Sequence, residues 1–154
     1  MHYDGTFEVS ASKEISYAFA TDPAKITTIF PDVDELKIID PENFELKTKI
    51  GISFIKGTLQ VKGTIAEKIP PKFVKLKAKA NGLNSSIELE SGFTMEDKES
   101  GGTTIRWTAD AVIGGLIIRV GSRLMDSAAR KYIDQIIESL KQKLSSIPQM
   151  VVQE

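Results

Sequence analysis

The chain has 154 residues, of which 41% are hydrophobic and 27% charged, and its formal net charge is −1. These values are typical of one soluble globular domain and exclude a disordered or fibrous chain. There is no cysteine, which excludes disulfides, thiolate metal sites and cysteine nucleophiles. The single histidine is His2, so a catalytic triad would need a residue from what we expect to be a frayed terminus.

The first part of the sequence predicts a strand followed by two short helices. Apolar and polar residues alternate over residues 3–10, as in a strand with one buried face. Ser12 then has the features of a helix N-cap. Asp22-Pro23 starts a second short helix, with the aspartate as cap and proline in the first turn, and Pro31 limits its extension.

The middle of the sequence predicts about six strands. A short strand over 36–39 precedes alternation over 44–50 and a long strand over 52–69. Within that long strand Phe54 is out of phase with Leu59, which predicts a bulge at Gly57. After Pro70-Pro71 comes a lysine-rich strand, and two further alternating strands flank a turn at 100–102.

The last part of the sequence predicts a long helix. From Leu116 the apolar period changes from two to 3.6 residues, which indicates an amphipathic helix over most of 116–146. We therefore expect one domain over residues 1–146 and a short flexible tail over 147–154. Because each strand and the helix have one apolar face to bury, the order predicts an α+β fold. In it a curved antiparallel sheet of six to seven strands wraps around the C-terminal helix.

Charge is distributed unevenly along the chain. Residues 1–45 hold three lysines and ten acidic residues, whereas residues 46–79 hold nine lysines and one acid, Glu67. The lysines alternate with apolar residues, which favours a solvated strand face that meets the acidic N-terminal segment. A patch for anionic lipid or an acidic partner protein stays open as an alternative. The low pI of about 5.9 disfavours nucleic acid as a partner.

The element order is similar to the helix-grip fold of the START/Bet v 1-like superfamily, which includes polyketide cyclases and lipid-transport proteins. Three segments resemble more narrowly the CoxG-like proteins, a family named after carbon monoxide dehydrogenase. They are residues 22–33, residues 49–65 and, most specifically, residues 101–131 with Gly114-Gly115 and the run GSRLMDSAARK. Asp32 departs from the family pattern, which usually has glycine after the proline, so a role of this loop in ligand entry is in doubt.

The resemblance implies an accessory protein of a carbon monoxide dehydrogenase-type molybdenum hydroxylase. Its implied roles are maturation, membrane recruitment of the enzyme and carriage of a quinone-like lipid. We expect a cytoplasmic protein that binds an apolar small molecule and no nucleic acid. Peripheral contact with the inner face of the membrane and a homodimer are left open, as are a cyclase/dehydrase-type enzyme and a ligand-free assembly scaffold.

The apolar faces predict a cavity between the sheet and the long helix, because small residues lie in phase with large ones on the inward faces. For each candidate, a packed core residue is the alternative interpretation. The candidate lining residues are Phe54, Leu59, Val61, Leu76, Leu89, Phe93, Trp107, Leu124, Ala128 and Tyr132. No spacing in the sequence indicates a catalytic set, a metal site or a cofactor motif.

Overall fold

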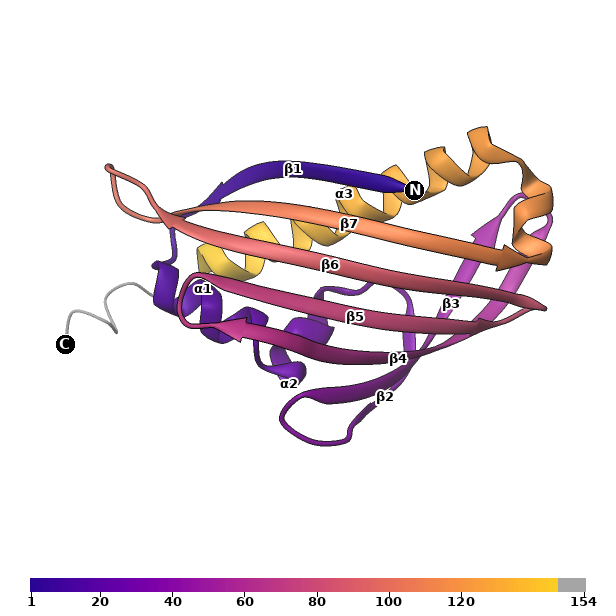
Figure 1. Ribbon diagram of the computed structural model, residues 1–154, viewed down its shortest axis with the longest axis horizontal. Helices are drawn as coiled ribbons and strands as arrows, with labels where there is room; N and C mark the ends of the chain where they lie inside the picture. Colours follow the sequence, from indigo (N-terminus) through magenta and orange to yellow (C-terminus); the bar gives the residue numbers. More distant parts are fainter. Residues whose placement is uncertain (147–154) are drawn as a thin grey trace.

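An antiparallel sheet of seven strands curves around a long C-terminal helix (Figure 1). The structure is a computed structural model, and it describes residues 1–146; the tail predicted over 147–154 lies outside the described residues. The strand order across the sheet is β1-β7-β6-β5-β4-β3-β2, so β1 and β2 are the edges. This architecture confirms the predicted α+β helix-grip class.

The strands are long and the helices are few. The strands are β1 (His2–Val9), β2 (Val33–Ile38), β3 (Asn43–Ile52), β4 (Ile55–Ile69), β5 (Phe73–Gly82), β6 (Ser85–Asp97) and β7 (Thr103–Gly115). The α-helices are α1 (Lys13–Ala20), α2 (Pro23–Ile26) and α3 (Ser122–Ser146), and the 3-10 helices are η1 (Thr27–Ile29) and η2 (Leu116–Val120).

Side-chain caps start the two short helices as predicted. The Ser12 hydroxyl accepts a hydrogen bond from the backbone N–H of Ile15 at 3.1 Å and so caps α1. The Asp22 carboxylate accepts one from the N–H of Ala24 at 2.9 Å at the start of α2. Each cap satisfies a backbone donor that the first helical turn leaves without a partner.

The predicted long strand over 52–69 is wrong, because its first residues belong to a turn. Ile52 pairs with Ile55, so Ser53 and Phe54 form a two-residue hairpin turn between β3 and β4. Phe54 is out of phase with Leu59 for this reason. The irregularity in β4 lies instead between Ile65 and Glu67.

The predicted start of the long helix is also wrong. Residues 116–120 form the 3-10 helix η2, and α3 begins only at Ser122. Two glycines bracket η2, and both have a positive φ, +88° at Gly115 and +91° at Gly121. A side chain at Gly115 would overlap the carbonyl oxygen of Asn84, so the backbone there requires glycine.

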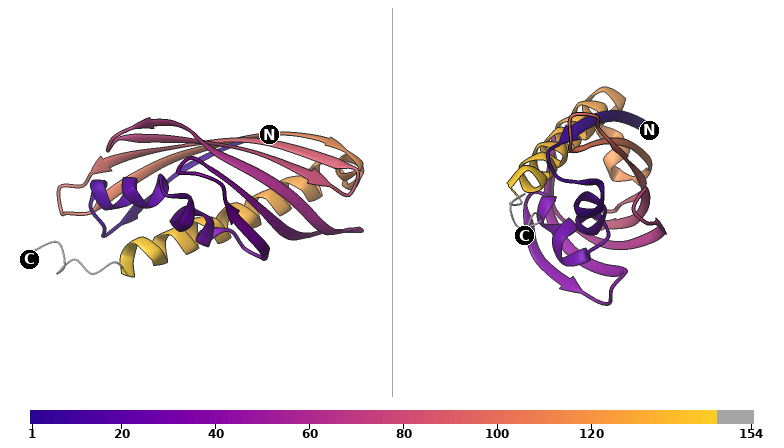
Figure 2. Two further views of the ribbon diagram at one scale, coloured as in Figure 1. Left: turned by 90° about the horizontal axis from the view of Figure 1, so that it is seen from below. Right: turned by 90° about the vertical axis from the view of Figure 1, so that its left-hand side faces the viewer.

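The tightly packed core occupies one end of the sheet. There α1, α2 and the C-terminal half of α3 cover the inner face of the strands (Figure 2). The buried cluster combines aromatic and aliphatic side chains from all these elements. It comprises Phe7, Val9, Ala11, Phe19, Ala20, Ile26, Ile29, Ile65, Val74, Phe93, Met95, Ile105, Leu140 and Leu144. Burial of this apolar surface is the main stabilising contribution to the fold.

A polar contact fastens α3 to the edge strand β1. The Tyr3 hydroxyl donates a hydrogen bond of 2.8 Å to Asp126, and the Arg130 Nε donates one of 3.0 Å to the same carboxylate. The Arg130 guanidinium also lies 5.1 Å from the centroid of the Tyr3 ring. The Tyr3 hydrogen bond, followed by that of Arg130, lowers the pKa of Asp126. This contact holds the first half of α3 beside β1.

Replacing Tyr3 with phenylalanine is expected to lower the urea midpoint of unfolding, because Asp126 loses its hydrogen bond to a buried phenol. The matched control is Tyr17→Phe. The Tyr17 hydroxyl is buried and has no hydrogen-bond partner within the described residues, so its removal should leave the midpoint unchanged or raise it. Equal losses in the two variants would show that the Tyr3–Asp126 contact does not stabilise the protein.

Candidate functional site

Away from the core, the inner face of the sheet is only half-buried. We call this region the open inner face; it combines inward side chains of β4, β5, β6 and β7. Its members are Val61, Leu76, Ala78, Ala80, Ile87, Leu89, Ser91, Ala111 and Ile113. A filled core would bury such side chains almost fully, as it does Ile105 on the same face of β7.

Pairing across the strands brings these side chains together. Val61, Ala80, Ile87 and Ile113 lie opposite one another from β4 to β7. A second row consists of Gly63, Ala78, Leu89 and Ala111. Residues opposite each other in adjacent strands share a face, so both rows point to the same side of the sheet. None of the side chains of the open inner face is ionisable.

Small residues in the middle of the sheet keep this face low. The alanines at 78, 80 and 111 are half-buried, which fits the predicted space above them. Gly63 does not contribute to that space. A Cβ at Gly63 would overlap the ring of Phe44, so this ring already fills the position. The inference that Gly63 leaves room for a ligand is therefore wrong.

The helix α3 spans the curved sheet from one side to the other. It contacts β1 near one edge and β3 and η1 near the other. Ala128 and Tyr132 are half-buried on α3. The helix thus crosses the inner side of the sheet, as the end-on view in Figure 2 shows.

Tyr132 is a neutral hydroxyl on α3. Burial, followed by the negative charge of Asp32, raises the pKa of Tyr132 to about 12. The phenol therefore stays protonated at neutral pH. It makes no hydrogen bond to any of residues 1–146, so its O–H is free to donate. A phenol of this kind can orient a carbonyl or ether oxygen of a ligand.

The structure distributes the ten predicted lining residues over several places. Val61, Leu76 and Leu89 belong to the open inner face, whereas Leu59 is buried and Phe93 belongs to the core cluster. Trp107 is half-buried, and its indole packs over Gly5 of β1. Phe54 and Leu124 are exposed, because one lies in a hairpin turn and the other in the first turn of α3.

Ile87 and Ile113 are absent from the predicted lining residues, although both belong to the open inner face. The signal for them is present in the sequence. Each lies two residues from a residue that the alternation places inward, Leu89 and Ala111, and residues at i and i+2 of a strand share a face.

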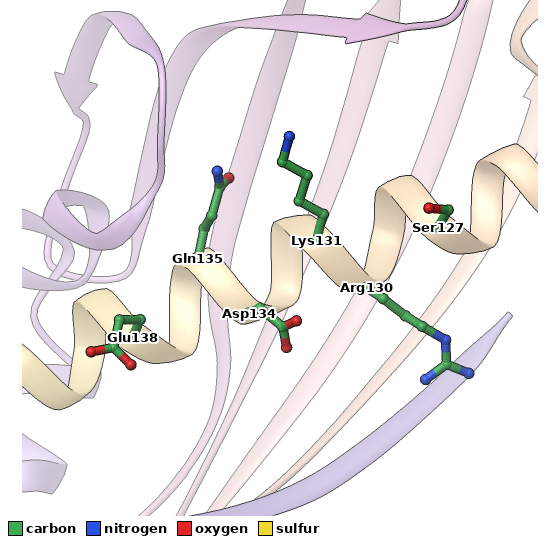
Figure 3. Close-up of a pocket in the computed structure, with 6 residues that line it drawn as sticks. All are labelled: Ser127, Arg130, Lys131, Asp134, Gln135 and Glu138. Carbon is green, nitrogen blue, oxygen red and sulfur yellow. The ribbon is translucent and has the colours of Figure 1, made fainter.

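Two hollows flank α3. One, of about 640 Å³, is lined by the exposed side chains of a single face of α3, which Figure 3 shows from Ser127 to Glu138. It is open and lined by polar and charged side chains, which does not suit an apolar ligand. The other, of about 420 Å³, lies between β1 and α3 and includes Tyr3, Trp107 and Ile133. Of the predicted lining residues, these two hollows contain only Trp107.

His2 does not lie at a frayed terminus, contrary to our expectation. It is the first residue of β1 and pairs with Asp110 of β7. Its ring nitrogens contact Asp110 at 2.6 Å and Asp4 at 2.9 Å. The hydrogen bond to Asp110, followed by that to Asp4, raises the pKa of His2 above its ordinary value of 6.5.

His2→Asn is expected to change stability in a pH-dependent way. Because the pKa of His2 is raised in the folded state, the imidazolium stabilises the fold fully below pH 6.5, and this contribution is lost as the pH rises through the folded-state pKa. The urea midpoints of the two proteins should differ in acid and converge in base. The effect is small because His2 is exposed. A difference that grows with pH would contradict the assignment.

The lysine-rich strand has two kinds of partner. On β5, Lys75 pairs with Glu90 of β6 at 2.9 Å. On β3, Lys47 pairs at 3.2 Å with Glu35, which belongs to the acidic N-terminal segment. The predicted contact with the acidic segment therefore holds for the lysines of β3, whereas β5 finds its acids on the neighbouring strand β6. Much of the basic charge of the sheet is balanced in this way.

Within residues 1–146, no group of three or more histidine or acidic residues is arranged to hold a metal ion. Among the helices that the structure describes, none combines the length and the apolar character needed to cross a membrane.

Comparison with protein families matches residues 5–145 to the carbon monoxide dehydrogenase family CoxG. A search of curated protein sequences finds no match. Among solved structures, a conserved protein from Geobacillus kaustophilus has a TM-score of 0.83 at 19% identity, over 94% of this chain and 95% of that one. A START superfamily protein from Mycobacterium smegmatis has a TM-score of 0.69 at 13% identity, over 93% and 96%. The Zhui aromatase/cyclase from Streptomyces sp. R1128 has 0.68 at 9%, over 94% and 93%. At these identities the structures show a shared START-like fold.

Proposed function

The chain belongs to the carbon monoxide dehydrogenase family CoxG, and from this membership we propose that it binds an apolar small molecule of the lipid or quinone class. The ligand would lie between the open inner face and α3. The observation that carries the proposal is the half-buried state of nine inward side chains, mostly apolar, on four adjacent strands. Covering such a face stabilises a complex by about 25 cal/mol for each Å² of apolar surface removed from water.

Each part of the site has a distinct role in this proposal. The alanines of β5 and β7 leave room for the ligand, and Val61, Leu76 and Leu89 make apolar contacts with it. Ala128 lets α3 pass close above. Tyr132 donates its neutral O–H to a ligand oxygen, which orients the head group. Specificity arises from this one polar group among apolar neighbours.

The alternative function is an enzyme of the cyclase type, because a structural neighbour is an aromatase/cyclase. Such chemistry needs an acid or a base that is placed against the substrate. No side chain of the open inner face ionises, and Tyr132 stays protonated at neutral pH. This composition favours carriage of a ligand over its conversion.

Family membership also motivates the proposed biological role. We propose an accessory role for a carbon monoxide dehydrogenase-type molybdenum hydroxylase, in maturation or in membrane recruitment. Affinity capture with the tagged full chain, with and without added quinone, tests this role. Recovery of a molybdenum hydroxylase would support it, whereas recovery of none under either condition would count against it.

The ligand-binding proposal is tested by titration with a short-chain ubiquinone analogue. Trp107 is the single tryptophan, and it is half-buried on the inward side of β7, so its fluorescence should be quenched on binding. Native mass spectrometry of the freshly purified protein with lipid extraction provides the independent readout. Unsaturable quenching together with a consistently empty protein would overturn the proposal.

Tyr132→Phe is expected to weaken quinone binding by about fivefold, since one hydrogen bond contributes about 1 kcal/mol. Binding of a hydrocarbon ligand without oxygen should be unchanged, because it has no acceptor for the phenol. The measurement is the pair of dissociation constants in both proteins. Equal weakening for both ligands would mean that Tyr132 acts only through packing.

A further inference from the structure

Three segments meet at the open end of the sheet, and we call them together the basic tip: residues 50–60, 81–87 and 112–125. The antiparallel order places the β3–β4 turn, the β5–β6 turn and the end of β7 with η2 at this same end (Figure 1). Hydrogen bonds fasten η2 to the β5–β6 turn, from the N–H of Leu116 to the Asn84 carbonyl at 2.8 Å and from that of Ile117 to the Ser85 hydroxyl at 2.9 Å.

Large apolar side chains are exposed on all but one of these segments. Phe54 in the β3–β4 turn is 63% exposed, Ile118 in η2 is 49% exposed, and Leu124 in the first turn of α3 is 48% exposed. Single exposed apolar residues are ordinary, but an aromatic and two aliphatic side chains at one end of a domain are typical of a surface that contacts something else.

The charge of the basic tip has one sign. Its three segments contain Lys56, Arg119 and Arg123 and no acidic residue. None of these three side chains makes an ion pair with the part of the chain that the structure describes. The lysines of the outer sheet face differ, since Lys47 and Lys75 pair with glutamates. The positive charge of the tip is therefore uncompensated.

We propose that the basic tip docks on an anionic lipid bilayer. Phe54, Ile118 and Leu124 would enter the boundary between head groups and acyl chains, while the three cations contact anionic head groups. Long basic side chains suit this position, because their stems lie along apolar surface and their charged ends reach the head groups. A bilayer offers both chemistries that the tip presents, an apolar layer beneath a negative surface.

This docking goes beyond the proposed ligand binding and gives it a direction. The half-buried side chains of the open inner face extend toward the basic tip, away from the core with α1 and α2. A docked protein would hold this end of the inner face against the bilayer. The site would then exchange an apolar ligand with the membrane without exposing it to water.

The test is flotation of the full chain with vesicles of phosphatidylglycerol and phosphatidylcholine, compared with vesicles of phosphatidylcholine alone. The protein is expected to float only with the anionic vesicles, and less as salt is added. Phe54→Ser should weaken partitioning about tenfold or more, because it removes the largest inserted side chain. Arg119→Gln should weaken it about fivefold.

Matched controls come from the opposite end of the sheet. Ile69, at the end of β4, is 48% exposed, and Ile69→Ser changes the same chemistry as Ile118→Ser. Lys72→Gln is the corresponding control for Lys56→Gln. Both opposite-end variants should bind vesicles like the original protein. Circular dichroism and the urea midpoint of each variant establish that it is folded.

The proposal is overturned if the anionic vesicles do not float the protein, or if Ile69→Ser weakens binding as much as Ile118→Ser. It is also overturned if the tip variants instead disperse a dimer or release a bound protein, since the occupant would then be a polypeptide. The vesicle assay needs no bound ligand. A protein that floats but does not bind quinone would therefore reject the proposed function alone.

Discussion

Replacing Ala80 with arginine is expected to weaken binding of an apolar ligand by about a hundredfold or more while the protein stays folded. Ala80 lies in the middle of the open inner face, opposite Val61 and Ile87. In the free protein the guanidinium reaches water, because the position is half-buried. A bound ligand would cover the charge without offering it a partner, at a cost of several kcal/mol.

The control for this variant is the next residue in the chain. Asn81 points to the outer face of β5 and is exposed, so Asn81→Arg adds the same charge on the other side of the same strand. It should bind the quinone analogue like the original protein. Titration of both variants by tryptophan quenching, with the urea midpoint as a check of folding, separates the two faces. Equal binding by Ala80→Arg and Asn81→Arg would place the ligand elsewhere.

Ile105→Ala is expected to lower the free energy of unfolding by about 2–5 kcal/mol, and Ile113→Ala by much less. The two isoleucines point to the same side of β7. Ile105 is 1% exposed within the core cluster, so its truncation leaves a cavity. Ile113 is half-buried on the open inner face, so its truncation only widens a space that is already open.

Urea denaturation of the two variants measures this difference directly. A gap of at least about 1 kcal/mol, with Ile105→Ala the weaker protein, would agree with a core confined to one end of the sheet. If the two losses were the same, the open inner face would be packed as tightly as the core. The ligand-free scaffold would then be the better interpretation, because no surface would remain for a ligand.

Local features of the fold were predictable because they depend on neighbouring residues. Alternating apolar residues in β1, β6 and β7 identified strands, and Ser12 and Asp22 identified helix starts through their caps. Gly114-Gly115 signalled the end of β7. The errors arose where local patterns are ambiguous. The apolar residues of η2 fit a helical period, but Gly121, with its positive φ, separates them from α3.

The candidate site was predictable only in part. Alternation identified which side chains point inward, and the composition of those positions excluded cysteine, histidine and most charged chemistry from the inner face. It did not separate Phe93, which is buried in the core, from Leu89, which is half-buried two inward positions away on the same strand. Both are large apolar residues at inward positions of β6.

The sequence by itself determined the strand faces, the α+β class and the apolar character of the interior, since these follow from periodicity and composition. Only the tertiary structure decided which inward residues are covered. That depends on where α1 and α2 dock, on the span of α3 between β1 and β3, and on Phe44 occupying the place above Gly63. Burial is a property of contacts between distant segments. Side chains with the same pattern therefore became core at one end of the sheet and an open face at the other.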